Sequence, residues 1–349
     1  MSGKKLGFGI VGCGVIAPWH REAVKRSDKA ELVACCDIDE PKGRKFAEES
    51  GSIAFYNDYH DLMRDPRVDV VSVCTPSGLH GEVTIAAAEA GKHVLCEKPI
   101  EITRKKIDAM IAACRRNGVK LGCIFQRRTH RASKLAREAV HNGLLGKMVL
   151  GDIYLKYYRS QAYYRSAGWR GTWALDGGGA LMNQGVHGID LALWIMGDVA
   201  SVYGRAAHLV RDIEVEDTGI ALLEYKNGAW GVLEGTTSVN PGEPTRLALH
   251  GSKGTIVLED ERITTWAVAE KDDEIAKPVE MHVEAERDGA ASDPTAIGVA
   301  GHVYLVNDLV QAIEEDREPF ITGESARKSV DLVLAVYESS RKGKRITLG

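Results

Sequence analysis

The sequence predicts an α/β protein with two domains: a doubly wound parallel sheet of the Rossmann type over residues 1–123, and an α/β domain with a large open mixed or antiparallel sheet over residues 124–349. Three observations support this fold class. The chain of 349 residues is longer than one hydrophobic core usually supports. Strand-like and helical patterns alternate in the first third, which is typical of a parallel sheet. After residue 200, strand-like runs follow one another without intervening helices, which indicates a mixed or antiparallel sheet.

Composition excludes several classes of function. The net charge of −4 gives no basis for binding nucleic acid or an acidic membrane surface. No apolar run approaches the length of a membrane span, and the first residues lack the apolar core of an export signal. The seven cysteines form no Cys-x-x-Cys pair, so we expect free thiols, no metal site and a cytoplasmic protein.

The first element is an apolar strand, Leu6 to Val11, followed by the run Gly12-Cys13-Gly14-Val15-Ile16-Ala17 and a helix to about Lys25. This run matches the dinucleotide-binding pattern Gly-x-Gly-x-x-Gly/Ala in its expected strand–turn–helix context. A small third residue lets helix and strand pack closely, and the helix N-terminus suits a diphosphate. The predicted cofactor contacts here are Gly12, Gly14, Val15 and Ile16.

The second strand, Leu32 to Cys36, ends on Asp37. A carboxylate in this place accepts hydrogen bonds from ribose hydroxyls and repels a 2′-phosphate, so the sequence favours NAD over NADP. Lys42 and Arg44 are close enough in sequence to hold a phosphate instead, which keeps NADP open as an alternative.

The alternation continues through the rest of the first domain. The predicted elements are a short helix from Asp58, a strand Val68–Cys74, a helix up to Ala90, a strand 92–96, a helix 103–116 and a strand Val119–Ile124. The turn after Cys74 contributes Thr75, Pro76 and His80 as further cofactor residues. His80 either contacts the cofactor or braces its turn.

The strand 92–96 leads into Glu97-Lys98-Pro99. A lysine at the carboxyl end of a parallel strand lies in the crevice where open α/β sheets bind ligands. Pro99 lacks an N–H and has a fixed φ, so the chain leaves the sheet sharply at this point. We therefore expect Glu97 and Lys98 at the cofactor.

The second domain begins with a helix predicted from Ser133 to Asn142 and strand-like sequence from Lys147. Residues 154–173 hold five of the eleven tyrosines, interleaved with tryptophans and basic residues. Aromatic faces and guanidinium groups suit a polyhydroxylated, anionic ligand. The predicted substrate residues in this segment are Arg159, Arg165, Trp169 and Arg170. The alternative is an aromatic strand in the core or at an oligomer interface.

Three consecutive glycines, 177–179, precede a predicted helix that carries Asn183, His187 and Asp190. The glycines are expected to leave the helix N-terminus bare for a ligand. Asn183 and His187 are four residues apart and therefore lie on one helical face. For an arbitrary histidine at this spacing, a hydrogen-bonded core residue is the alternative.

The motifs Gly-x-Gly-x-x-Ala, Thr-Pro-x-x-x-His and Ala-Gly-Lys-His-Val-x-x-Glu-Lys-Pro together resemble the Gfo/Idh/MocA oxidoreductases over essentially the whole chain. The resemblance implies that Lys98 lies at the nicotinamide and takes part in catalysis, with Asn183 and His187 in the active site. Most members carry Asp where this chain has Asn183. The resemblance also implies substrate contacts near Arg128, although Thr129-His130-Arg131 replaces the usual aromatic residue and proline. An open sheet used for oligomerisation is a further implication, so we expect a dimer or tetramer.

The remaining predicted elements complete the scaffold. They are strands near 202–210, 218–226, 229–237, 245–250 and 254–259, a loop 284–302, and helices 303–316 and 324–342.

The expected function is NAD-dependent transfer of hydride from a secondary alcohol of a sugar, sugar derivative or cyclitol. In this hypothesis His187 is the base, Lys98 polarises the oxygen and Asn183 holds the hydroxyl. Two alternatives stay open at this point: an NAD-dependent glycosidase that oxidises its sugar transiently, and a non-catalytic sugar or nucleotide sensor. A pure binding protein needs neither Lys98 nor His187.

Overall fold

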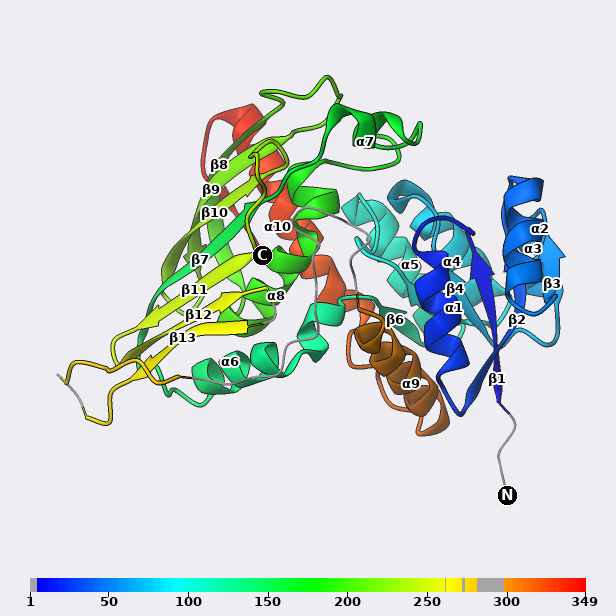
Figure 1. The fold of residues 1–349 in the computed structure, drawn as a ribbon, viewed down its shortest axis with the longest axis horizontal. Coiled ribbons are helices and arrows are strands. Elements are labelled where there is room, and N and C mark those ends of the chain that lie inside the picture. Colours follow the sequence, from blue (N-terminus) through cyan, green and yellow to red (C-terminus); the bar gives the residue numbers. More distant parts are fainter. Residues whose placement is uncertain (1–4, 261, 272–273, 281–297) are drawn as a thin grey trace. The chain divides into compact units, whose positions relative to one another are not determined.

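The computed structural model describes residues 5–260, 262–271, 274–280 and 298–349 (Figure 1). The described residues divide into two compact units: Met1–Gln126 with Val299–Arg327, and Arg127–Gly298 with Lys328–Gly349. The first break lies three residues beyond the predicted boundary at residue 123. The second domain was predicted as one continuous stretch, 124–349, and this is wrong for residues 299–327, which pack in the first unit.

The first unit contains a six-stranded parallel sheet with the order β3-β2-β1-β4-β5-β6, which confirms the doubly wound fold. The strands are β1 (Leu6–Val11), β2 (Ala30–Cys36), β3 (Ala54–Tyr56), β4 (Val70–Val73), β5 (His93–Cys96) and β6 (Leu121–Cys123). Every residue of β4 is buried, as expected for a strand covered on both faces.

Helices follow most of these strands. They are α1 (Ala17–Lys25), α2 (Glu40–Glu49), α3 (Tyr59–Arg64), α4 (His80–Glu89) and α5 (Arg104–Arg116). Asp58 and Thr103 cap α3 and α5 with side-chain hydrogen bonds to backbone N–H groups, which fixes where these two helices begin. Helix α2 and strand β3 were not predicted from the sequence.

A late segment of the chain completes the first unit. Helix α9 (Ala300–Glu314) packs on α1, as Figure 1 shows. After α9, the Cys123 N–H donates to Ile321 O at 3.0 Å, and Gly122 pairs with Thr322 in an isolated bridge. The predicted loop 284–302 is wrong at its end, because α9 already includes Ala300–His302, and residues 284–297 lie outside the described residues.

The second unit contains an eight-stranded mixed sheet with the order β13-β12-β11-β7-β10-β9-β8-β14. Its strands are β7 (Met148–Lys156), β8 (Val199–Ala207), β9 (Thr218–Tyr225), β10 (Trp230–Thr236), β11 (Arg246–Gly251), β12 (Gly254–Glu259), β13 (Arg262–Val268) and β14 (Ile346–Thr347). The β10–β7 pair is parallel and the other pairs are antiparallel, which confirms the mixed sheet. Strands β13 and β14 were not predicted from the sequence.

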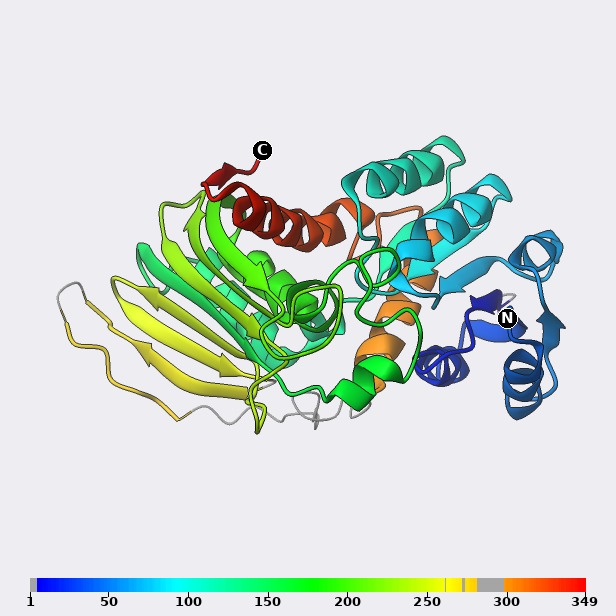
Figure 2. The same ribbon diagram turned by 90° about the horizontal axis from the view of Figure 1, so that it is seen from above.

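Helices cover one face of this sheet, as Figure 2 shows. They are α6 (Arg131–His141), α8 (Val186–Met196) and the greater part of α10 (Gly323–Lys342), with α7 (Gln161–Arg165) in the connection after β7. Large apolar side chains on β8, β9 and β10 are exposed, namely Tyr203, Ile220, Leu222 and Trp230. No helix in the described part of the chain has the length and hydropathy needed to cross a membrane.

Candidate active site

The turn after β1 has the geometry of a diphosphate-binding loop. Gly12 has φ +95°, and a Cβ there would lie 2.6 Å from the carbonyl oxygen of Cys74, so only glycine fits. A Cβ on Gly14 would meet nothing within 4 Å, so the backbone here is open to close approach. No side chain caps the N-terminus of α1 at Ile16, and Val15 is exposed. The residues predicted from the glycine pattern thus form an open helix N-terminus suited to an anion.

Asp37 lies at the end of β2 and is almost fully buried. Its Oδ2 accepts a hydrogen bond from the Cys13 N–H at 2.8 Å, and its Oδ1 accepts from the Asp39 N–H at 2.9 Å. Lys42 Nζ lies 3.0 Å from Oδ2. Arg44 pairs with Glu40 on its own helix. The carboxylate is therefore tied to the glycine turn, and the lysine that could have held a phosphate is engaged by Asp37.

His80 braces the strand-to-helix turn after β4. Its Nδ1 lies 2.8 Å from Pro99 O and its Nε2 lies 2.9 Å from Thr75 O. Both ring nitrogens thus face carbonyl oxygens of the first unit. These contacts link the Thr75-Pro76 turn to Pro99, and they favour the bracing role over a contact between the ring nitrogens and a cofactor.

Glu97 is the centre of a buried cluster with two histidines. Its Oε1 lies 2.9 Å from His20 Nε2 and 3.4 Å from His302 Nε2, and its Oε2 accepts the Lys98 N–H at 3.1 Å. Burial by itself would raise the pKa of Glu97, but hydrogen bonds and electrostatic interactions with the two histidines hold it well below the usual range. The carboxylate predicted to contact the cofactor instead anchors the backbone of Lys98.

Among the described residues, these three form a group whose ligand-capable atoms lie within 4.8 Å of one another. The Nδ1 atoms of His20 and His302 are buried and have no hydrogen-bond partner in the described part of the chain. A neutral Nε2–H tautomer on each ring therefore satisfies Glu97 without burying an unpaired N–H at Nδ1. Hydrogen bonding thus accounts for the geometry of the cluster.

Gly178 and Gly179 pack closely against other residues of the second unit. A Cβ on Gly178 would lie 2.1 Å from the Tyr337 hydroxyl, and one on Gly179 would lie 2.1 Å from Glu216 O. The buried Glu216 carboxylate accepts the N–H groups of Gly179 at 3.0 Å and Leu181 at 2.8 Å. The expectation of a bare N-terminus here is wrong, because Glu216 occupies these donors.

Asn183 and His187 do not lie on one regular helix. Ala180–Gln184 form a π-helical turn, and α8 begins after Gly185. The expected one-turn relation between the two side chains is therefore wrong in detail. Asn183 is buried, whereas His187 lies in the first turn of α8 and is partly exposed.

Four polar side chains of the second unit are joined in a row. Arg159 Nε donates to Gln184 Oε1 at 2.9 Å, and Gln184 Nε2 donates to Asn183 Oδ1 at 2.8 Å. Asn183 Nδ2 in turn donates to Asp176 Oδ1. Arg159 was predicted to bind substrate, but it is buried and holds the side chain beside Asn183.

Arg128 was also predicted to bind substrate. It is buried, and its Nε and Nη2 donate to the two carboxylate oxygens of Asp190 at 2.7 and 2.5 Å. This bidentate ion pair uses two in-plane N–H donors along one edge of the guanidinium, in the interior of the second unit. Arg128 thus holds α8 through Asp190, and the substrate contact expected of it stays a prediction.

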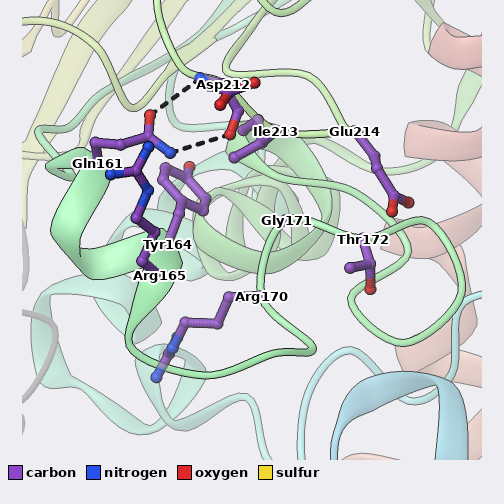
Figure 3. A pocket seen from close by; sticks show the side chains of 9 residues that line it. All are labelled: Gln161, Tyr164, Arg165, Arg170, Gly171, Thr172, Asp212, Ile213 and Glu214. Atoms are coloured by element: carbon purple, nitrogen blue, oxygen red, sulfur yellow. Dashed lines mark hydrogen bonds between the residues drawn. The ribbon is translucent and has the colours of Figure 1, made fainter.

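A pocket of about 420 Å³ lies beside α7 (Figure 3). Its lining residues are Gln161, Tyr164, Arg165, Arg170, Gly171, Thr172, Asp212, Ile213 and Glu214. Gln161 and the backbone of Asp212 exchange two hydrogen bonds of 3.0 Å, and Arg165 extends beside Gln161. Arg170 donates to the Tyr163 hydroxyl and lies over the rings of Tyr163 and Trp169.

The aromatic segment 154–173 thus serves two purposes. Tyr157 and Tyr164 are buried and hydrogen-bond Thr245 and Thr237, so they belong to the core. Arg165 and Arg170 line the pocket, and Trp169 packs on Arg170.

Comparison with known proteins identifies the family. A model described as "Oxidoreductase family, NAD-binding Rossmann fold" matches residues 6–139, and one described as "GFO/IDH/MocA C-terminal domain" matches residues 133–257. The myo-inositol 2-dehydrogenase of Thermotoga maritima is 30% identical over 350 residues, which cover 98% of each protein. The chain belongs to the Gfo/Idh/MocA family. D-glucoside 3-dehydrogenase of Escherichia coli is 28% identical over 351 residues, covering 91% of this chain and 97% of that protein.

Solved structures of NADH-bound dehydrogenases share the fold of this chain. The WlbA dehydrogenase of Bordetella pertussis, crystallised with NADH and UDP-GlcNAcA, has a TM-score of 0.88 and 32% identity and covers 100% of this chain and 99% of that chain. Levoglucosan dehydrogenase, crystallised with NADH and levoglucosan, has a TM-score of 0.86 at 24% identity over 99% of both chains, which supports the fold alone.

As a Gfo/Idh/MocA protein, the chain is an oxidoreductase that uses NAD. The turn fits this cofactor, because Gly12 and Gly14 leave the backbone accessible and α1 begins without a side-chain cap. Asp37 lies at the end of β2 as the sequence predicts.

Three residues that hold predicted site residues were not predicted from the sequence: His20 in the first unit, and Asp176 and Glu216 in the second. His20 reaches Glu97 across 77 positions, and Glu216 reaches Leu181 across 35 positions. No local periodicity signals such contacts. Asp176 stands directly before the glycine run, and its acidic side chain seven residues before Asn183 was the one signal available.

Proposed function

We propose that the protein is an NAD-dependent dehydrogenase that oxidises a secondary alcohol of an acidic sugar derivative. Neutral sugars and cyclitols are the alternative substrates for the same reaction. Relatives named as dehydrogenases of myo-inositol and D-glucoside support the reaction class. The WlbA dehydrogenase, crystallised with UDP-GlcNAcA, makes a nucleotide sugar acid the first compound to test.

The observation that supports an anionic substrate is the exposed Arg165 in the pocket of the second unit, whose lining also includes Arg170, Asp212 and Glu214. Arg165 is exposed on α7 and has no hydrogen bond or ion pair within the described ranges. Arg170 is connected to Asn183 through the Tyr163 hydroxyl and Gln184, since both Arg170 and Gln184 donate to that hydroxyl. The pocket and the proposed site residue thus belong to one polar network, and a carboxylate or phosphate is the natural partner of Arg165.

The proposed roles of the site residues follow the chemistry of alcohol oxidation. NAD, when bound, would supply the acceptor for the hydride that leaves the carbinol carbon. His187 accepts the hydroxyl proton, because an imidazole titrates close to neutral pH. The Lys98 ammonium donates a hydrogen bond to the reacting oxygen, which stabilises negative charge as the proton leaves. Asn183 holds the hydroxyl by hydrogen bonding.

We propose the remaining site residues on the same basis. The diphosphate is held by backbone groups of Gly12, Gly14, Val15 and Ile16, and the ribose is held by Asp37. The rest of the cofactor site is shaped by Thr75, Pro76, His80 and Glu97. The substrate is contacted by Arg165, Trp169 and Arg170. A cytoplasmic homo-oligomer is part of the same proposal. It is supported by the seven cysteines, all buried and free, and by the exposed apolar side chains on β8, β9 and β10.

The test is a substrate screen that follows NADH formation by absorbance. The panel pairs each sugar acid or nucleotide sugar acid with its neutral analogue and includes inositols. We expect an acidic compound to give the highest kcat/KM. Arg165→Ala should raise KM for that compound about tenfold to a hundredfold, since a hydrogen bond to a charged group contributes about 1.5–3 kcal/mol. The same substitution should leave the KM for the neutral analogue almost unchanged.

Three results would contradict the proposal. Equal or better activity with neutral compounds would exclude an acidic compound as the preferred substrate. Sugar release without net NADH formation identifies an NAD-dependent glycosidase. Ligand binding without turnover on the whole panel identifies a sensor. Arg116→Ala, at an exposed arginine of α5, controls for the loss of a positive charge.

A further inference from the structure

We propose that Asp176 is a positioning residue that sets the orientation of the Asn183 amide. The inference rests on the proposed function in one respect, namely that Asn183 contacts the substrate. It explains why an asparagine suits position 183, and it predicts that the residues at 176 and 183 can be exchanged only together.

Asp176 forms the acceptor end of the row of polar side chains. It is 2% exposed, and both carboxylate oxygens receive hydrogen bonds. Oδ2 accepts the Gly171 N–H at 2.8 Å, and Oδ1 accepts Asn183 Nδ2. An ionised carboxylate only accepts hydrogen bonds, so the group of residue 183 that faces it must be a donor.

Arg159 forms the donor end of the same row. It is 4% exposed, and a guanidinium only donates. The Gln184 oxygen must therefore face Arg159 Nε, at 2.9 Å. This leaves the Gln184 amide nitrogen facing the Tyr163 hydroxyl and Asn183 Oδ1, both at 2.8 Å. The two amides are thus fixed in one direction, from a cation that donates to an anion that accepts.

The fixed direction determines what Asn183 offers to a ligand. The NH₂ group of Asn183 faces Asp176 and its oxygen faces Gln184, so the amide presents a donor on the Asp176 side and an acceptor on the Gln184 side. A flipped amide would place oxygen against the carboxylate and NH₂ against the NH₂ of Gln184. Both contacts would be repulsive in a buried place. Asp176 therefore acts on the reaction through the orientation of Asn183.

Replacing Asn183 alone by aspartate breaks this pattern. Two carboxyl groups would then face each other, and one of them would have to hold a proton. The replacement Asp176→Asn together with Asn183→Asp restores it. The asparagine at 176 accepts from Gly171 and donates to the aspartate at 183, which also accepts from Gln184. The hydrogen bonds from Gly171 to residue 176, between residues 176 and 183, and from Gln184 to residue 183 are all kept, with donor and acceptor exchanged between 176 and 183.

The charged and titratable groups around the pair stay the same in all variants. Tyr163, Tyr164 and Tyr337 lie close enough for the charge of Asp176 to affect their pKa values. Arg159 and Arg170 supply the nearby positive charge. Burial raises the pKa of Glu216 to about 7 against its hydrogen bonds, so the wild type itself has a titration in this range. The wild-type profile is therefore the reference for every comparison.

The experiment compares the wild type, Asp176→Asn, Asn183→Asp and the double variant. Melting temperatures are measured without substrate or cofactor, and kcat and KM are measured from pH 5 to pH 9. We expect Asn183→Asp to lower the melting temperature and to lower kcat at least tenfold at pH 8. Its kcat should recover as the pH falls, because a proton bound between the two carboxyl groups restores a donor. The double variant should regain most of both losses and lack this acidic recovery.

The proposal is overturned if Asn183→Asp keeps the wild-type pH profile and melting temperature. It is equally overturned if the double variant is no more stable than Asn183→Asp. Should Asn183→Asp fail to fold, a folded double variant supports the proposal and an unfolded one overturns it. Asp28→Asn, at an exposed aspartate, controls for the loss of one carboxylate. The melting temperatures carry this test even if the proposed dehydrogenase activity is absent.

Discussion

At the scale of single residues, each unit keeps a proposed site residue in place with buried hydrogen bonds. In the first unit, the Glu97 carboxylate accepts the backbone N–H of Lys98 while two histidines hold the carboxylate itself. In the second unit, Asp176 and Gln184 hold Asn183 from its two sides. Supporting contacts of this kind fix side-chain geometry, which is a large part of what a protein contributes to catalysis.

The proposed division of roles predicts how turnover responds to two substitutions. His187→Ala removes the proton acceptor and Lys98→Met removes the donor to the reacting oxygen. Each should lower kcat by about two orders of magnitude or more, within the 10²–10⁴-fold range of general acid–base groups. NAD binding, followed by fluorescence, should be retained in both variants.

Two exposed positions serve as matched controls: His208→Ala after β8 and Lys105→Met on α5. Both controls should keep wild-type turnover. Near-normal turnover of His187→Ala together with complete loss in Lys98→Met would show that Lys98 is the base and that the roles are reversed.

At the scale of elements, the Glu97 carboxylate joins three segments of the first unit by hydrogen bonds. His20 comes from α1, Glu97 follows β5 and His302 comes from α9. Helix α1, the loop that holds Lys98 and helix α9 are thus connected inside the first unit. A substitution at one of these elements should affect the other two.

The depressed pKa of Glu97 predicts a pH-dependent stability. A carboxyl whose pKa is lower in the folded state stabilises the fold fully above its unfolded pKa of about 4.3, and this contribution is lost as the pH falls towards the folded pKa. Glu97→Gln should therefore lower stability by about 1–3 kcal/mol at pH 7, the usual cost of unsatisfied buried donors. The difference from the wild type should shrink below about pH 4.5.

Thermal melts from pH 3.5 to pH 8 measure this difference, with Glu82→Gln on the exposed face of α4 as the control. A difference that stays constant over the whole pH range would show that Glu97 acts by packing alone.

The elements also show how far the sequence can predict this structure. Helix α1 begins and ends where the glycine pattern places it, because strand, turn and first helical turn are encoded within twenty neighbouring residues. The π-helical turn Ala180–Gln184 was not predictable, because the hydrogen-bond acceptor for the backbone N–H groups at its start is Glu216, which lies far away in the sequence. The Asn183 motif was found from its residue types, whereas the orientation of its amide depends on Asp176 and Arg159. Features that depend on neighbouring residues can be predicted from the sequence, whereas hydrogen bonds between distant positions cannot.

At the scale of the whole molecule, the large sheet carries an exposed apolar stripe. Leu222 on β9 is the register partner of Tyr203 on β8 and lies 62% exposed, and Trp230 at the start of β10 is 66% exposed. Contiguous exposed apolar residues on a sheet face mark an interaction surface. They are consistent with the oligomer that the family resemblance implies.

The double replacement Leu222→Lys with Trp230→Lys tests this face. We expect the wild type to sediment as a dimer or tetramer and the variant as a smaller species. The dissociation constant should rise at least tenfold, because burying unpaired ammonium groups costs more than about 1.4 kcal/mol. Leu209→Lys with Val210→Lys, at two exposed apolar residues after β8, is the matched control. A monomeric wild type, or an unchanged variant, would contradict the interpretation.

The discontinuous first unit has a consequence for synthesis on the ribosome. Strand β6 pairs with the Thr322 segment, and α1 packs on a helix that begins at Ala300. A nascent chain that has emerged as far as Gln126 holds the whole parallel sheet but lacks its late helix, and Glu97 lacks His302. The cofactor unit can be completed only after nearly all of the second unit has been translated. The part of the protein that is translated first is therefore among the last to be finished.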